Sequence, residues 1–290
     1  CYISALRRAG VQHARGYDYN AAGRSEGLVR HANLAGTADK GGVLALMGDD
    51  HGGESSTVCH QSEYAMMDVM IPVLNPANLE EMVDFVLHGW ALSRFASVWC
   101  GMKCVKDNIE STASVTLTPD SFHTHLPNDF EMPMGGLNIR RADHRHEQEQ
   151  RLHAHKMRAV NAYVRANKLD RVTLNGGQAP RFGIVSTGKA YMDVVQALAD
   201  LGVDAKVAEK LGLSVYKIGM SWPVEPEGLK TFASGLSQIL VVEEKRGLLE
   251  SQVKEILYNT VQPPAVFGKY DLEGARLLTE EGSITSMEVA

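Results

Sequence analysis

The sequence predicts an α/β fold with parallel strands, and two observations support this prediction. In the last third of the chain, short apolar runs alternate with segments of helical periodicity, as in strands joined by right-handed crossovers. Nearer the start, residues 43–47 form an apolar run with the length and character of a strand buried on both faces. This run stops at Gly48 and is followed by acids, a histidine, glycines and hydroxyls. The carboxyl end of such a strand is the usual position of a ligand site in an open α/β sheet.

The composition is that of an ordinary globular protein. The 290 residues, 44% of them hydrophobic and 22% charged, suffice for two domains or one large one. A net charge of −6 argues against nucleic acid or an anionic membrane surface as the main partner. No apolar run approaches the roughly 20 residues that a membrane-spanning helix needs. The four cysteines are irregularly placed, which argues against a disulfide framework and favours a cytoplasmic setting.

The first part of the chain should contain three helices. Ser25 can cap a helix that stops near Gly36, and residues 64–69 form a second, short helix. Asn78 is a good N-cap for a longer helix, because glutamates follow in its first turn where the helix dipole favours anions. Apolar residues recur in that helix at helical spacing and are expected to face a core: Leu79, Met82, Val83, Val86 and Trp90.

A second buried strand is expected at residues 98–105. It contains Cys100 and Cys104, whose spacing differs from that of redox and zinc motifs. Positions four apart share one face of a strand, so both thiols are predicted to pack in a core.

The middle of the chain predicts a connection between domains. Residues 116–140 are interrupted by proline and glycine and should be irregular, and residues 143–169 should form a polar bridging helix. The alternation of the last third then begins after a break at residues 175–180. It predicts strands at 182–186, 213–218, 239–243 and 265–267, and helices at 189–201, 205–211, 227–234 and 248–258.

Six histidines cluster in and before the bridging helix and raise the question of a metal site: His123, His125, His144, His146, His153 and His155. His144 and His146 are two residues apart on a predicted helix and should therefore point to different faces. A solvated polar helix is the better interpretation, and no metal site is predicted here.

Two further motifs leave alternatives open. Residues 183–190 nearly match a phosphate-binding P-loop, but Ala190 stands where the magnesium-binding hydroxyl should be, so a nucleotide-binding protein is only a distant alternative. Residues 243–246, at the end of an apolar strand, are either a surface charge cluster or a strand-end site at a domain interface. The sequence alone does not separate these two interpretations.

At residues 41–63 the sequence resembles the bacterial indolepyruvate ferredoxin oxidoreductases. The resemblance covers roughly residues 24–290 and continues in several separate stretches: residues 31–37, 71–76, 89–94, 129–133, 188–191, 217–220, 222–223 and 241–246. Residues 1–23 do not resemble the family. The chain begins with Cys1 and ends in what looks like an unfinished helix, so we expect it to be a piece of a longer polypeptide.

The resemblance implies an enzyme that decarboxylates an aryl 2-oxoacid such as indolepyruvate on thiamine diphosphate and Mg²⁺. Electrons would pass through [4Fe-4S] clusters to ferredoxin, and the acyl group to coenzyme A. The fold would be the C-terminal part of a thiamine-diphosphate pyrimidine-binding domain, residues 24–117, then a connection and bridging helix, residues 118–180. A transketolase-C-terminal-like parallel α/β domain would follow, at residues 181–290. A homodimer is also expected.

The resemblance further implies that the loop after the first strand faces the substrate. His51 and His60 are the predicted catalytic residues, because an imidazole can bind a carboxylate or transfer a proton. The predicted substrate-binding residues are Asp49, Asp50, Ser55, Ser56, Gln61 and Ser62. The glutamate that activates the cofactor, the Mg²⁺ motif and the cluster cysteines are expected on other segments of the full protein, so the isolated chain should be inactive. The alternative is a non-catalytic scaffold or interface module of such an enzyme.

Overall fold

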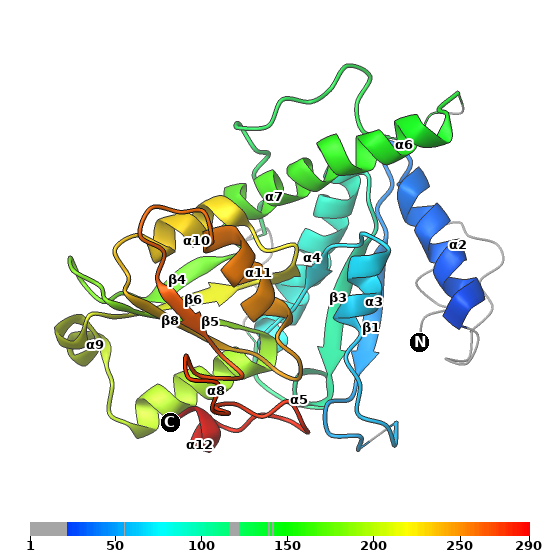
Figure 1. Ribbon diagram of the computed structural model, residues 1–290. Coiled ribbons are helices and arrows are strands. Elements are labelled where there is room, and N and C mark those ends of the chain that lie inside the picture. The colour runs from blue at the N-terminus through cyan, green and yellow to red at the C-terminus, as the bar shows by residue number, and fades with distance from the viewer. Residues whose placement is uncertain (1–21, 55, 116–121, 139, 141) are drawn as a thin grey trace.

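Two β-sheets, each flanked by helices, lie side by side in the computed structural model (Figure 1). The structure describes residues 22–290 apart from residues 55, 116–121, 139 and 141. Most of the atypical start predicted at residues 1–23 therefore lies outside the described residues, as does the predicted site residue Ser55. The α/β fold class predicted from the sequence is confirmed.

The first sheet has four strands in the order β1 (Leu44–Asp49), β3 (Cys100–Val105), β2 (Val73–Leu74) and β7 (Met220–Trp222). The first three run parallel, and β7 pairs antiparallel with β2. The two short strands β2 and β7 were not predicted from the sequence. Because β7 comes from the last third of the chain, the first sheet is completed by a segment distant in sequence.

The prediction that the first strand is buried on both faces is wrong. β1 is an edge strand, and its Leu46 is 39% exposed while Met47 is fully buried. β3, which lies between β1 and β2, is buried along its whole length. Cys100 and Cys104 pack in the core as predicted, where burial raises the pKa of both thiols, that of Cys104 to about 11.

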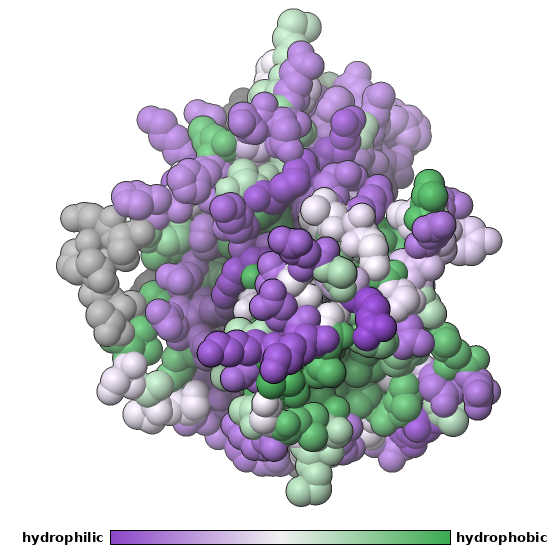
Figure 2. All heavy atoms as spheres, turned by 90° about the vertical axis from the view of Figure 1, so that its left-hand side faces the viewer, coloured by the Kyte–Doolittle hydropathy of each residue, from purple (hydrophilic) through white to green (hydrophobic). Residues whose placement is uncertain are grey.

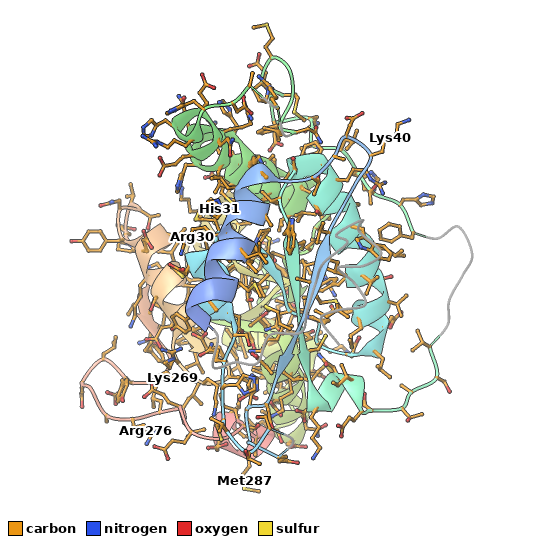
Figure 3. All side chains as sticks on the ribbon, turned by 90° about the vertical axis from the view of Figure 1, so that its right-hand side faces the viewer. Arg30, His31, Lys40, Lys269, Arg276 and Met287 are labelled. Carbon is orange, nitrogen blue, oxygen red and sulfur yellow. The ribbon has the colours of Figure 1, made fainter. Side chains whose placement is uncertain are left out.

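Helices cover both faces of the first sheet. One face packs against α4 (Leu79–Ala96) and against α7 (Met157–Ala166) from the bridging segment. The other packs against α2 (Ala22–Ala35) and α3 (Glu63–Asp68). Figure 3 looks from the side of α2, which lies in front of the sheet. α2 already begins at Ala22, so the prediction that Ser25 caps it is wrong.

Asn78 caps α4 as predicted, because its side chain accepts a hydrogen bond from the Glu81 amide at 3.0 Å. The predicted core face is partly wrong. Val83 and Trp90 are exposed, whereas Phe85 and Leu92 are buried. The helical period is right, but the buried stripe is rotated, because the strands lie under a different side of the helix than the sequence pattern suggests.

The bridging segment is helical in three consecutive pieces: α6 (Arg145–Arg151), a π-helical turn η2 (Leu152–Lys156) and α7. Residues 122–138, which precede it, contain neither helix nor strand, in agreement with the predicted irregular connection. The prediction of a polar, solvated helix fits α6, which has no buried residue, but not α7. Tyr163 and its neighbours on α7 belong to the core of the first sheet.

The second sheet contains five strands in the order β4 (Arg171–Leu174), β6 (Leu213–Ile218), β5 (Phe182–Thr187), β8 (Gln238–Val242) and β9 (Ala265–Phe267). The four predicted strands are present and parallel, and β4, which was not predicted, is antiparallel at one edge. The order of β5, β6, β8 and β9 reflects helical crossovers between parallel neighbours.

The helices of this part also match the predicted positions closely. α10 (Pro226–Ala233) and α11 (Leu248–Leu257) cover one face of the second sheet. The other face packs against α8 (Gly188–Asp200) and the C-terminal tail, which we define as residues 268–290 and which includes α12 (Ser286–Val289). Two short helices, α5 (Lys106–Ile109) and α9 (Ala205–Leu211), complete the described elements. The face of the molecule on the α9 side is largely hydrophilic, with hydrophobic residues gathered in its lower half (Figure 2).

The prediction that His144 and His146 point to different faces is wrong. His144 and His146 do not point apart, because His144 precedes α6 as its N-cap and the two rings lie 5.1 Å apart. Within the described residues, no group of three or more histidine, cysteine, aspartate or glutamate side chains could hold a metal ion. None of the described helices combines the length and apolarity that a membrane crossing requires.

Candidate functional site

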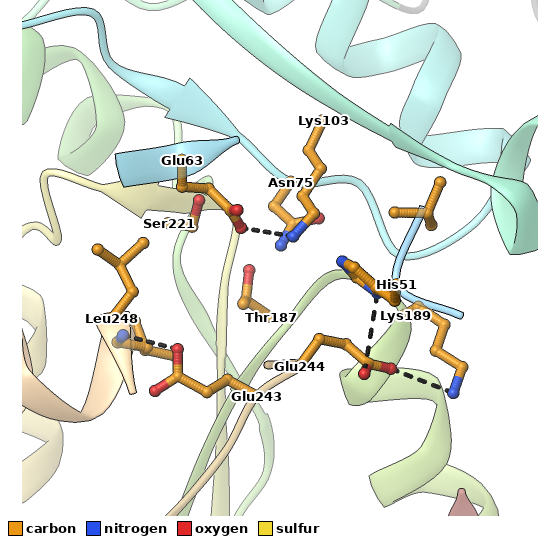
Figure 4. Close-up of a pocket in the computed structure, with 12 residues that line it drawn as sticks. His51, Glu63, Asn75, Lys103, Thr187, Lys189, Ser221, Glu243, Glu244 and Leu248 are labelled. Carbon is orange, nitrogen blue, oxygen red and sulfur yellow. Dashed lines mark hydrogen bonds and ion pairs between the residues drawn. The ribbon is translucent and has the colours of Figure 1, made fainter. Parts of the chain in front are cut away.

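The carboxyl ends of the parallel strands of both sheets converge on one region between the sheets (Figure 4). The loop after β1 begins there with Asp49, Asp50 and His51, and the turn after β8 enters from the opposite side with Glu243 and Glu244. All five of these side chains are buried. The edge of the first sheet named by the strand-end argument therefore faces the strand ends of the second sheet.

Lys103 is the charged centre of the part contributed by the first sheet. This fully buried residue of β3 forms ion pairs with Glu63 at 2.6 Å and Asp49 at 3.3 Å. Burial alone would lower the pKa of Lys103, but the two carboxylates outweigh it and raise that pKa. The three residues come from β3, α3 and the end of β1, so their pairing fixes the position of α3 against the strand ends.

His51 lies between the two sheets with an uncommitted ring. Its side chain is buried, and neither ring nitrogen makes a hydrogen bond to any described residue. Nδ1 is 3.8 Å from a carboxylate oxygen of Glu244, too far for a direct hydrogen bond. Burial lowers the pKa of His51 to about 2, and the neighbouring lysines, Lys103 foremost, add to this effect. The imidazole is consequently neutral at physiological pH.

The second sheet supplies an ion-paired group next to His51. Glu244 is 3.2 Å from the ammonium of Lys189, at the start of α8, and accepts a hydrogen bond from the Ile284 amide at 3.0 Å. Lys189 also pairs with Asp193 at 2.9 Å. Glu243 accepts hydrogen bonds from the Leu249 and Glu250 amides at the start of α11, yet burial raises its pKa to about 7. Residues 243–245 thus form a buried interface turn and not a surface charge cluster, whereas Arg246 after them is exposed.

The hydroxyls of the predicted site are engaged by its acids. The carboxylate of Asp50 accepts from the Ser56 amide at 2.6 Å and its hydroxyl at 3.1 Å. Asp49 accepts from the amide and the hydroxyl of Ser62. These bonds hold the loop after β1 in a closed form around the two acids. Substrate contacts by Asp49, Asp50, Ser56 and Ser62 stay a prediction.

His60 and Gln61 lie nearer the rim of the loop. Both ring nitrogens of His60 face carbonyl oxygens, those of Val58 and Gly48, each at 3.1 Å. Partial burial would lower the pKa of His60, but the two carbonyls and the acid Asp49 raise it, so the imidazolium is favoured. The Oε1 atom of Gln61 is buried without a hydrogen-bond partner among the described residues.

Space in this region is divided unequally. The inner cavity, lined by His51, Glu63, Lys103, Glu243 and Glu244 among others, measures only about 10 Å³, room for roughly one water molecule. A larger hollow of about 380 Å³ lies on the outer side of His51 and is lined chiefly by acidic and hydroxyl side chains, among them Asp50, Glu54, Asp107, Glu110 and Ser283. His51 and Val105 line both spaces, and of the two only His51 carries a polar side chain.

The P-loop-like stretch at residues 183–190 is packed shut. Gly183 lies within β5, and Gly188 opens α8 with a φ of +56°, where a Cβ atom would lie 2.3 Å from Oδ1 of Asn75. Lys189, which would contact phosphate in a true P-loop, is already paired with Glu244 and Asp193. Asn75 and these ion pairs occupy the helix start where a phosphate would bind.

Sequence reasoning missed several members of the region. Lys103 and Glu63 were not singled out, although a lysine inside an otherwise apolar buried strand indicates a buried acidic partner. Glu244 and Lys189 were noticed only within motifs assigned to other possibilities. Their meeting with His51 depends on how the two sheets pack, which no local pattern encodes.

The described residues do not by themselves fit the cofactors implied by the sequence resemblance. They contain no group of acids and histidines that could hold Mg²⁺. Cys100 and Cys104 face the core with thiols whose pKa is raised, unlike the thiolates that bind iron–sulfur clusters. The inner cavity is also too small for an aromatic ring.

Comparison with known proteins finds similarity to indolepyruvate oxidoreductases. Residues 172–290 match a family model described as an indolepyruvate oxidoreductase domain, a range that begins within β4 of the second sheet. Indolepyruvate oxidoreductase subunit IorA of Methanothermobacter thermautotrophicus is 25% identical over 245 residues, which are 82% of this chain and 37% of that protein. The corresponding subunit of Pyrococcus horikoshii is 23% identical over 220 residues, 74% of this chain and 32% of that protein. The chain thus spans about a third of the length of these relatives.

Solved structures support the fold. A 2-oxoglutarate:ferredoxin oxidoreductase from Magnetococcus marinus, solved with 2-oxoglutarate, coenzyme A and succinyl-CoA, has a TM-score of 0.56 at 15% identity, covering 99% of this chain and 57% of that one. A split-gene transketolase, an inactive β4 tetramer, has a TM-score of 0.53 at 16% identity, covering 93% of this chain and 70% of that one. Residues 172–290 thus match the indolepyruvate oxidoreductase domain model, and most of the chain is similar to IorA subunits.

Proposed function

We propose that this chain is part of an oxidoreductase that converts an aryl 2-oxoacid, such as indolepyruvate, to its acyl-CoA with release of carbon dioxide and transfer of two electrons to ferredoxin. The observation that carries the proposal is the position of the loop after β1. This loop, which resembles the family in sequence, places a buried imidazole with uncommitted nitrogens where the carboxyl ends of two sheets meet. The relatedness to IorA subunits and to a 2-oxoacid:ferredoxin oxidoreductase fold supports the reaction class.

The two histidines suit different tasks in such a reaction. Burial keeps His51 neutral, and the remaining N–H of a neutral imidazole can donate a hydrogen bond to a developing negative charge. His60, whose surroundings favour the charged form, can attract the carboxylate of a 2-oxoacid to the rim. The Oε1 atom of Gln61, which accepts no hydrogen bond from a described residue, adds a polar group to the loop. In this proposal Asp49, Asp50 and the hydroxyls bound to them act by holding the loop.

The remaining parts of the enzyme are proposed to lie outside this chain. Thiamine diphosphate with Mg²⁺, when bound by other domains, would supply the carbanion chemistry of decarboxylation. The [4Fe-4S] clusters that pass electrons to ferredoxin would likewise be held elsewhere, in a cytoplasmic homodimer. Within the chain we propose a pyrimidine-domain part at residues 24–117, a connection at 118–180 and a transketolase-C-terminal-like domain at 181–290. Strand β7 of this last domain pairs with β2 of the first sheet.

Kinetics of the full-length protein test this function. His51→Ala and His60→Ala should each lower kcat/KM for indolepyruvate, the first by roughly 100-fold if it stabilises charge in the transition state. His31→Ala is the matched control, because His31 is exposed on α2, beyond β1 on the side away from the second sheet (Figures 1 and 3). Normal kcat/KM in both loop variants would contradict a catalytic loop.

The second candidate is a scaffold or interface module without chemistry of its own. The closed inner cavity and the ion pairs beside it, Lys103 with Glu63 on the first-sheet side and Lys189 with Glu244 on the second-sheet side, favour this interpretation, because a purely structural interface would contain them. The same experiment decides between the two. A loop that only joins the sheets would lower the melting temperature when altered but would leave kcat/KM of the folded enzyme unchanged.

A further inference from the structure

The turn after β8 contacts the loop after β1 through three consecutive residues. Glu244 approaches the ring of His51, as described above. Lys245 donates a hydrogen bond from its ammonium to the backbone carbonyl of His51 at 2.7 Å. The guanidinium of Arg246 lies over the ring of Tyr64, 4.0 Å from its centroid, at the start of α3. The turn thus contacts the segment that contains most of the predicted site residues near both of its ends, at His51 and at Tyr64.

Lys245 holds the central position in this contact. It is 7% exposed, and a second hydrogen bond from its ammonium reaches the carbonyl of Gly282 in the C-terminal tail at 3.2 Å. A buried ammonium bound by carbonyl oxygens of two segments far apart in the sequence joins those segments to its own strand. Lys245 therefore connects the first sheet, the second sheet and the tail.

The backbone of Lys245 has a strained conformation. Its φ is +59°, in the left-handed region that residues with a Cβ atom rarely adopt. Such a conformation persists only where the surroundings hold it in place. Here the carboxylate of Glu243 binds the first amides of α11 on one side, and Glu244 binds the Ile284 amide on the other.

The residues directly after His51 allow the backbone unusual freedom. Two glycines follow His51, and the second, Gly53, has a φ of +70°. The His51 ring has no hydrogen bond to a described residue that would fix it. Its carbonyl is thus the atom through which the second sheet holds His51 by a hydrogen bond.

We propose that Lys245 is a positioning residue, which ties the carbonyl of His51 to the second sheet and so holds the His51 imidazole at the meeting point of the two sheets. The tie itself is a property of the fold. Its consequence for the reaction rests on the function proposed above for the loop after β1.

Hydrogen exchange of the full-length protein tests the tie. The amides of Ser56, His60 and Ser62 are hydrogen-bonded within the loop after β1 and report on its closure. Lys245→Met should speed their exchange by about tenfold or more. Lys156→Met is the matched control, because the ammonium of Lys156 is also buried and also donates to two backbone carbonyls, those of Leu34 and Ser97, which lie outside the loop after β1 and the turn after β8. It should leave those amides within about twofold of the wild type. Lys245→Gln, too short to reach both carbonyls, is measured in the same way in case the methionine variant does not fold.

Kinetics separate the tie from the proposed function. Misplacement of a catalytic group should lower kcat by roughly 10- to 100-fold with little change in KM, and Lys245→Arg, which can still donate, should restore part of the loss. Faster exchange in Lys245→Met with unchanged kcat would support the tie but remove the loop from catalysis, so the function proposed above would fail. Unchanged exchange in both Lys245 variants, or an equal rise in Lys156→Met, would overturn the proposal.

Discussion

Two histidines nine residues apart in one loop have opposite electrostatic surroundings. His51 is buried among lysines and kept neutral, whereas His60 faces two carbonyl oxygens and an acid that favour its charged form. The same residue type thus supplies a neutral hydrogen-bonding group and a cationic one, as a result of position alone.

The lowered pKa of His51 predicts a defined dependence of stability on pH. In the folded state this pKa is about 2, and in the unfolded chain it is 6.5, so the unfolded state binds the extra proton between these values. The stability of the wild type should therefore fall as the pH drops below 6.5, by up to about 1.4 kcal/mol per pH unit from this group. Above pH 6.5 its contribution should be constant.

Comparison with His51→Asn, which carries no titrating ring, isolates the effect of His51 from that of other buried groups. Urea unfolding of the two proteins between pH 5 and pH 8 should give free energies of unfolding that converge or cross as the pH falls. Parallel curves over this range would show that the proton is not excluded from His51 in the folded state.

At the scale of elements, the end of β1, α3 and β3 are joined by one lysine. Lys103 satisfies two buried carboxylates at once, and together these residues fill the edge of the first sheet at which the site lies. The arrangement explains why a lysine is tolerated at a position of β3 that is otherwise surrounded by apolar residues.

Lys103→Met should destabilise the protein by about 3–5 kcal/mol, because Asp49 and Glu63 would be left buried without a counter-charge. The second substitution Glu63→Gln should recover part of this loss by removing one of the two charges. Lys106→Met is the matched control, since Lys106 lies three residues further along on the surface and pairs only with the exposed Glu54. Chemical denaturation measures all four proteins. A loss confined to the Lys106 variant would refute the central role of Lys103.

At the scale of the whole molecule, the two sheets are fastened at a second point besides the site. Glu81 of α4 pairs with the fully buried Lys217 of β6 at 2.6 Å and with Arg171 of β4 at 2.9 Å. The aromatic ring of Phe85 lies 5.2 Å from the same ammonium. This contact, the tie at Lys245 and the pairing of β7 with β2 hold the two sheets in one fixed orientation.

Glu81→Gln should therefore destabilise the folded chain by about 3–5 kcal/mol, because the ammonium of Lys217 would lose its anion in a buried position. The double variant Glu81→Leu with Lys217→Met, which removes both charges, should be substantially more stable than the single change. Glu80→Gln serves as control, as Glu80 is the exposed neighbour on the same helix turn. If thermal and urea unfolding gave Glu81→Gln and Glu80→Gln the same stability, this account would be contradicted.

Local patterns in the sequence determined the elements of this protein well. The strands and helices after residue 181, the N-cap at Asn78 and the core positions of Cys100 and Cys104 all follow from hydrophobic periodicity, turn residues and capping chemistry, which act over a few neighbouring residues. The edge at which a site should lie also followed, because it depends only on where a strand ends.

Tertiary structure alone decided which residues meet there. β7 crosses to the first sheet, β1 becomes an exposed edge, and Glu244 and Lys245 reach His51 across nearly 200 residues of chain, while Lys189 pairs with Glu244. Each of these outcomes depends on how one sheet packs against the other, and no short-range pattern specifies such contacts. The sequence by itself therefore determined the fold class and most of the elements and predicted an edge for the site, whereas the packing of the two sheets decided which residues and charges meet at that edge.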